Sequence, residues 1–124
     1  MASHIGQVNS TYKNMTSSIW VTEFACTDCT LEASQQFYNQ STSYFDNQLP
    51  YVTHYSYFGA FRSDVSNVGP NAAFLTGKGK LTNIGSWYLG HGATGNVPHG
   101  SASAVAKFAG WGFVVAASAF WTLC

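Results

Sequence analysis

Two groups of side chains near the start of the sequence could carry chemistry. Glu23 closes a mostly apolar run, Ile-Trp-Val-Thr. A carboxylate is rarely buried in a protein unless it is paired or functional. A free carboxylate can act as an acid, a base or a nucleophile. Cys26 and Cys29 form a Cys-x-x-Cys shortly afterwards, which can form a disulfide or exchange thiols.

The segment that must position Glu23 is predicted to be a short buried strand over residues 19–26. It is rich in β-branched and aromatic residues and is flanked by polar turn residues. Glu23 lies near its carboxyl end, where chemistry takes place in parallel α/β sheets and barrels. The alternative is an ordinary strand-end glutamate that faces solvent. Strict alternation predicts two faces, Ile19 with Val21 and Glu23 on one, and Trp20 with Thr22 and Phe24 on the other.

The rest of the first ninety residues alternates between helices and strands. Helices are predicted over residues 2–14, 31–47 and 81–89, and a second strand over residues 51–58. Thr30 is the expected N-cap of the long helix, and Pro50 follows its end. This order implies βα units and a parallel sheet, but two parallel strands leave both edges unpaired and are not a self-sufficient domain. The last helix is expected to face inward with Leu81, Ile84, Trp87 and Tyr88.

Composition narrows the function classes. The chain has 124 residues and is one domain at most. Its formal net charge is zero and only 8% of its residues are charged, so a nucleic acid is not an expected partner. Aromatic residues make up 16%, which suits either a carbohydrate-facing surface or an ordinary aromatic core. The four scattered histidines and one Cys-x-x-Cys lack zinc-ligand spacing, so neither a metal nor a cofactor is expected.

Three features favour a secreted or cell-surface protein. Asn9, Asn14 and Asn39 each begin an Asn-x-Ser/Thr sequon, a candidate N-glycosylation site. Residues 91–107 are mostly small and polar, and residues 108–124 are an uncharged apolar run that resembles a GPI-attachment signal. A tail-anchor helix and a buried amphipathic helix are the alternatives for that run. No signal peptide opens the sequence, so we expect the natural chain to begin further upstream.

The spacing of Cys26 and Cys29 leaves two interpretations open. A Cys-x-x-Cys between a strand and a helix is where a thioredoxin-like redox pair lies, and Pro50 before the second strand mimics the proline loop of that fold. A secreted chain uses cysteines as readily for a structural disulfide. The sequence also leaves open whether Cys26 pairs with Cys29 or with another cysteine.

Three blocks of sequence resemble the C-terminal part of the alkali-sensitive-linkage-type glycosyl hydrolases. They are residues 19–26 (IWVTEFAC), 54–61 (HYSYFGAF) and 79–89 (GKLTNIGSWYL), within a resemblance that spans about residues 5–89. This family, glycoside hydrolase family 128, contains fungal β-1,3-glucanases with a (β/α)₈ barrel. The resemblance implies that residues 1–90 are the last two βα units of such a barrel, an α/β fold and a partial catalytic domain.

The same resemblance implies roles for individual residues. Glu23 matches the catalytic nucleophile at the end of the seventh barrel strand. Tyr57 falls where the eighth strand often has a tryptophan beneath the sugar, and Phe58 and Phe61 are its expected neighbours in binding β-1,3-glucan. The implied mechanism is retaining hydrolysis, in which two carboxyl groups lie about 5–5.5 Å apart, one as nucleophile and one as general acid.

One departure from the family pattern concerns the general acid. The family places it on the fourth strand, and none of the remaining carboxylates matches its motif. A complete barrel needs about 200–250 residues. We therefore expect these residues alone to be inactive, with a thiol oxidoreductase and a non-catalytic, wall- or membrane-anchored glucan-binding remnant as alternatives. The remaining carboxylates are Asp28, Glu32, Asp46 and Asp64.

Overall fold

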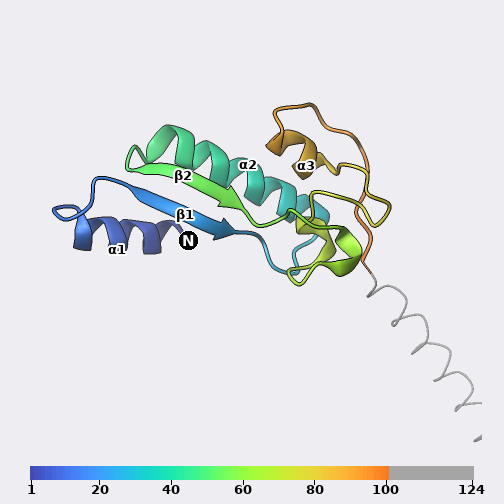
Figure 1. Ribbon diagram of the computed structural model, residues 1–124, viewed down its shortest axis with the longest axis horizontal. Helices are drawn as coiled ribbons and strands as arrows, with labels where there is room; N and C mark the ends of the chain where they lie inside the picture. Colours follow the sequence, from blue (N-terminus) through green and yellow to red (C-terminus); the bar gives the residue numbers. More distant parts are fainter. Residues whose placement is uncertain (101–124) are drawn as a thin grey trace, which may run out of the picture.

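The structure of the protein is a computed structural model that describes residues 1–100 (Figure 1). The chain folds in the order α1 (Ala2–Tyr12), β1 (Ile19–Phe24), α2 (Leu31–Gln48), β2 (Val52–Tyr57) and α3 (Asn83–Tyr88). Two short 3₁₀ turns, η1 (Ser63–Val65) and η2 (Pro70–Ala72), lie between β2 and α3. The three predicted helices and two predicted strands are thus confirmed, and the first and last helices are shorter than expected.

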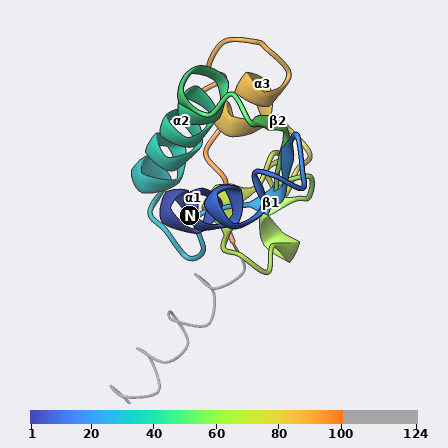
Figure 2. The ribbon, with the colours of Figure 1, turned by 90° about the vertical axis from the view of Figure 1, so that its left-hand side faces the viewer.

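The two strands form a parallel sheet, as the alternation of helices and strands predicted. In the end-on view of Figure 2, α1 and α2 lie on the same side of the two strands. The loops that follow β2 gather at the end toward which both strand arrows point (Figure 1). The arrangement is a helix layer on one face of a small parallel sheet, and the (β/α)₈ barrel stays a prediction.

Local chemistry sets both ends of α2. The Thr30 side chain accepts a hydrogen bond of 3.2 Å from the backbone N–H of Ala33, which satisfies one of the free donors of the first turn. Glu32 adds a negative charge in that turn, where the helix dipole favours it. The helix ends at Gln48 because Leu49 precedes Pro50, and a residue before proline disfavours helical backbone.

The strict alternation predicted along β1 is wrong. The parallel register shifts between Val21 and Phe24, so two residues of β1 oppose one of β2. As a result Val21 and Phe24 both pack against the core, although alternation had put them on opposite faces. Trp20 is 64% exposed, and its ring lies 4.7 Å from that of His54 across the sheet.

The core is an aromatic cluster between the sheet and α2. Phe24 of β1 meets Phe45 of α2 edge-to-face at 5.2 Å and Tyr57 of β2 edge-to-face at 5.3 Å. Tyr38 of α2 meets Tyr57 in the same way at 5.2 Å. Such pairs add about 0.5–1.5 kcal/mol each beyond the burial of their area. The high aromatic content of the chain therefore serves the core in large part.

The last helix is fixed by a buried threonine. Thr82 is 3% exposed; its hydroxyl donates to the carbonyl of Ala73 at 2.8 Å and accepts from the N–H of Gly85. Ile84 packs inward at 1% exposure, as predicted. Tyr88 is 43% exposed, so its predicted inward position is wrong, because the helix already ends there.

The predicted tail lies mostly outside the described part of the chain. Of the small, polar segment, residues 91–100 are described and form neither helix nor strand. The apolar run at residues 108–124 lies outside the described residues, and the GPI-signal or membrane interpretation stays a prediction. Within residues 1–100, no helix combines the length and apolar character needed to cross a membrane.

Candidate functional site

The carboxyl ends of the two strands bring the predicted site residues to one end of the sheet. Glu23 is the next-to-last residue of β1, and Phe58 directly follows β2. The backbone N–H of Phe58 donates a 2.9 Å hydrogen bond to the carbonyl of Phe24, which ties the two strand ends together. The structure therefore places Glu23 and Phe58 on adjacent strand ends, as the parallel sheet requires.

Glu23 is exposed to solvent and lines a groove of about 350 Å³ between α1 and β1. The groove is mostly apolar apart from His4, Thr22 and Glu23, and its walls come from the start of α1 and from the first five residues of β1. A carboxylate in the wall of such a groove can approach a ligand that lies along the strand. The other lining residues are Met1, Ile5, Val8, Ile19, Trp20, Val21 and Thr22.

Phe58 and Phe61 form an aromatic pair just beyond β2. Their rings meet edge-to-face with centroids 5.4 Å apart, and both side chains are half-buried. A partly open ring pair beside a strand end can offer a flat surface to a sugar. Their proposed contact with substrate stays a prediction.

Tyr57 lies in a different environment from the one that a substrate-stacking ring needs. It is 3% exposed, and its ring stacks on Phe74 at 5.7 Å inside the core. Burial raises its pKa to about 12, with the neighbouring Tyr38 adding to the shift. Its hydroxyl is buried and has no hydrogen-bond partner. In this structure the Tyr57 side chain is buried in the core on the helix side of the sheet. This position does not favour the predicted role beneath a sugar.

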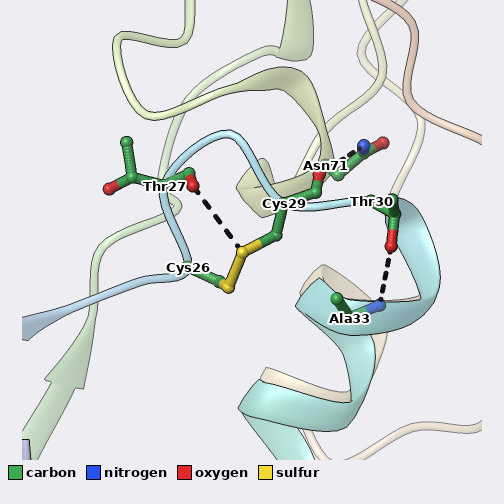
Figure 3. The surroundings of a disulfide bond; sticks show 6 residues. All are labelled: Cys26, Thr27, Cys29, Thr30, Ala33 and Asn71. Atoms are coloured by element: carbon green, nitrogen blue, oxygen red, sulfur yellow. Dashed lines mark hydrogen bonds between the residues drawn. A yellow bond between two sulfur atoms is a disulfide. The ribbon is translucent and has the colours of Figure 1, made fainter.

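A disulfide joins Cys26 to Cys29 in the loop that leaves β1 (Figure 3). The loop turns at Asp28, whose φ of 52° is unusual for a residue other than glycine. The Asp28 N–H donates to the carbonyl of Val68 at 3.0 Å, and the Asn71 side chain donates to the carbonyl of Cys29 at 2.9 Å. The disulfide loop after β1 is thus docked on the loop after β2.

The position of the cysteines bears on the redox alternative. Both precede Thr30, the N-cap of α2, so neither lies within the first turn of the helix. A redox-active Cys-x-x-Cys depends on that first turn to lower the pKa of its attacking thiol. The arrangement suits a structural disulfide better, and the redox role stays a prediction.

The remaining candidate residues are spread over the fold. Asn9 lies in α1, Asn14 in the turn after it and Asn39 on the exposed side of α2, and their glycosylation stays a prediction. Within residues 1–100, no group of three or more His, Cys, Asp and Glu side chains could hold a metal ion.

Sequence reasoning missed two features that depend on contacts between distant residues. One is the exposed pair of Trp20 and His54, which only the strand register brings together. The other is a groove between α2, β2 and α3 that is lined by aromatic rings and polar side chains. Its members are scattered between residues 38 and 91, so no local sequence signal could have grouped them.

Comparison with known proteins identifies a family for this chain but no individual relative. No curated protein and no solved structure matches the chain. A family model described as "Glycosyl hydrolase catalytic core" matches residues 1–88, which is well over half of the sequence. The chain therefore belongs to the glycosyl hydrolase catalytic core family.

Proposed function

We propose that this protein carries the nucleophile of a retaining β-1,3-glucan hydrolase, and that Glu23 is that nucleophile. The observation that supports it most is the position of Glu23, which is exposed at the carboxyl end of β1, on the strand adjacent to β2. Membership of a glycosyl hydrolase family supports the reaction class. The resemblance to glycoside hydrolase family 128 supports the choice of β-1,3-glucan.

In the proposed mechanism the Glu23 carboxylate attacks the anomeric carbon of a glucosyl unit. The glycosidic bond breaks, a covalent glycosyl-enzyme forms, and a general acid gives its proton to the departing oxygen. Water then attacks the anomeric carbon and gives its proton to the same, now deprotonated, acid group, which releases Glu23 as a carboxylate. The apolar groove along β1 and the Phe58–Phe61 pair would hold the sugar beside the carboxylate.

The general acid is the missing component of this proposal. Asp46 is bonded to the Tyr55 hydroxyl on the helix side of the sheet, Asp28 belongs to the disulfide loop, and Glu32 and Asp64 lie on α2 and η1. None of them matches the family's acid motif. General acid–base catalysis typically contributes about 10²–10⁴-fold, so we propose that these 124 residues alone do not turn over laminarin.

A covalent trap tests the nucleophile without needing the acid. The probe is a 2-deoxy-2-fluoroglucosyl donor with a dinitrophenolate leaving group. This leaving group departs without protonation, and the fluoroglucosyl group accumulates as the glycosyl-enzyme. We expect intact-mass analysis to show one added fluoroglucosyl group, which peptide mapping places on Glu23. The matched control is Glu32→Gln, since Glu32 is also an exposed glutamate and lies in the first turn of α2.

The outcomes separate the alternatives. Labelling that survives Glu23→Gln, or no labelling of the unmodified chain, would contradict the proposed nucleophile. Turnover of laminarin that Glu23→Gln abolishes would contradict only the proposed inactivity. Retention on insoluble β-1,3-glucan without any labelling would favour the glucan-binding alternative.

The substrate class also suggests where the protein works. β-1,3-Glucan is a polysaccharide of the fungal cell wall, so we propose a secreted or wall-associated protein. The three Asn-x-Ser/Thr sequons support this location. A mass decrease on endoglycosidase treatment of the natural protein would test it.

A further inference from the structure

A second groove lies on the helix side of the sheet, between α2, β2 and α3. It has a volume of about 550 Å³ and shares no lining residue with the groove that contains Glu23. Four of its lining residues are aromatic and four others carry polar side chains. The lining residues are Tyr38, Asn39, Thr42, Asp46, Tyr55, Trp87, Tyr88, Gly90 and His91.

The aromatic rings of this groove differ in how open they are. Tyr38 and Trp87 stack on each other with centroids 6.2 Å apart and form the buried part. Tyr88 is 43% exposed and rests against Phe74 at 4.7 Å, so its ring stands at the rim in a held position. A held ring loses little conformational freedom when a ligand covers it.

The polar side chains stand close to these rings. Tyr55 donates its hydroxyl to Asp46 at 2.9 Å, which leaves the other carboxylate oxygen to accept from a ligand. Thr42 donates its own hydroxyl back to the α2 carbonyl of Tyr38, so its oxygen retains acceptor capacity. Asn39 adds an amide at the edge of the groove. The site therefore offers both ring faces and several hydrogen-bonding atoms.

The charge of the groove limits what it would accept. Neither lysine nor arginine lines it, and Asp46 is its one carboxylate. By contrast, a groove of about 360 Å³ near the loops after β2 is lined by Lys78, Lys80 and His99. An anionic ligand would meet like charge at Asp46 and no compensating lysine or arginine in the groove next to α2.

We propose that the groove between α2, β2 and α3 binds a short neutral oligosaccharide at a site separate from the candidate catalytic carboxylate. A pyranose presents an apolar face of C–H groups that can lie on Tyr88 or Trp87, while its hydroxyls are both donors and acceptors. Binding sites of this kind combine aromatic walls with a few placed polar groups. The proposal rests on the chemistry of the groove and not on the role of Glu23.

Titration of the isotope-labelled full chain with named sugars tests this site. The chain is made in a host without N-glycosylation, so that changes in the signals around Asn39 report on the added probe alone. Laminaritetraose and cellotetraose are the neutral probes, and tetragalacturonate is the acidic one. We expect at least one neutral probe to shift the amide signals of Thr42, Tyr88 and His91, and the acidic probe to leave them in place.

Variants then assign the binding to the groove. Tyr88→Ala removes an exposed ring and should raise the Kd for the neutral probe about tenfold. Tyr88→Phe keeps the ring, and this variant should bind the probe nearly as well as the wild type. Tyr12→Ala is the matched control, because Tyr12 is a similarly exposed tyrosine that lines neither groove. It should leave the Kd unchanged.

Several results would overturn the proposal. They are the absence of shifts with both neutral probes, stronger binding of tetragalacturonate, and an unchanged Kd in Tyr88→Ala. Covalent labelling of Glu23 in the Tyr88→Ala variant reports separately on the proposed nucleophile. A failure at one site therefore does not imply a failure at the other.

Discussion

The side-chain amide of Asn71 donates a 2.9 Å hydrogen bond to the main-chain carbonyl of Cys29, 42 residues earlier in the chain. This bond connects the loop that leaves β1 with the turn η2 that follows β2. The backbone bond from Asp28 to Val68 lies beside it. The two segments that flank the candidate site are therefore held to each other and not only to their own strands (Figure 3).

Replacing Asn71 with alanine should destabilise the protein. The variant leaves the half-buried carbonyl of Cys29 without its donor, which typically costs about 1–2 kcal/mol of unfolding free energy. Asn47→Ala is the control, because Asn47 also donates to a carbonyl but on the exposed surface of α2, and it should cost less than about 0.5 kcal/mol. Urea unfolding measures both free energies. Equal losses of unfolding free energy in the two variants would show that the Asn71 bond stabilises the fold no more than a surface hydrogen bond does.

The disulfide between Cys26 and Cys29 should stabilise the fold moderately. A loop this short loses little chain entropy on closure, so the chain-entropy estimate is about 2 kcal/mol. The Cys26→Ser, Cys29→Ser double variant should lose that amount, and dithiothreitol should lower the wild type to the same value without further effect on the variant. Insulin reduction by the reduced wild type, with its two thiols oxidised to the Cys26–Cys29 disulfide, would instead support the redox alternative.

The elements were predictable from sequence where local chemistry decides them. Thr30 and Pro50 limit α2 through a side-chain cap and a steric restriction, and both act within a few residues. The side-chain pattern of β1 was not predictable, because its register shift arises only when it pairs with β2. The exposure of Tyr88 depends likewise on where α3 ends against its neighbours.

The candidate site was predictable in part. The parallel sheet brings Glu23 and Phe58 to adjacent strand ends, and the sequence order of strands and helices was enough to expect that. The surroundings of Tyr57 were not foreseeable, since Tyr38 and Phe74, which cover it, lie 19 residues before it and 17 residues after it. The general acid has no counterpart that sequence reasoning or the described residues supply.

Tyr57→Phe should preserve or raise stability. The Tyr57 hydroxyl is buried without a partner, so its removal relieves a desolvation cost and we expect a gain of up to about 1 kcal/mol. Tyr55→Phe is the matched control, because it removes a hydrogen bond to Asp46 and should lose about 1 kcal/mol. Thermal unfolding compares the two, and a clear loss in Tyr57→Phe would reveal a partner for that hydroxyl.

Stability should fall in alkaline solution between pH 10 and about pH 12. Burial, together with a hydrogen bond to Asp46 for Tyr55, raises the pKa of Tyr55 and Tyr57 from 10.0 to about 12 in the folded chain. Below pH 10 both phenols are protonated whether the chain is folded or unfolded, and their full contribution is present. Above pH 10 the unfolded chain loses protons that the folded chain keeps, so the unfolding free energy declines with rising pH.

Urea unfolding at several pH values, with absorbance near 295 nm to follow phenolate, measures this decline. The Tyr55→Phe, Tyr57→Phe double variant should show a shallower dependence in the same window. A wild-type unfolding free energy that stays constant from pH 9 to pH 12 would contradict the raised pKa values.

A methyl group at Gly85 should displace α3. A Cβ built there would overlap the carbonyl oxygen of Phe74, the same carbonyl that accepts from the N–H of Thr82. Because backbone atoms form the contact, relief requires α3 to move, and we expect Gly85→Ala to cost about 1–3 kcal/mol. Gly6→Ala in α1 meets no atom within 4 Å and should stabilise by about 0.5–1 kcal/mol.

The same pair of variants also tests the proposed sugar site. Movement of α3 carries Trp87 and Tyr88 with it, so Gly85→Ala should weaken binding of the neutral oligosaccharide, whereas Gly6→Ala should leave its affinity unchanged. Labelling of Glu23 by the fluoroglucosyl donor should persist in both folded variants, because α3 contributes no residue to that groove. Loss of labelling in Gly85→Ala alone would instead mean that α3 supports the strand ends.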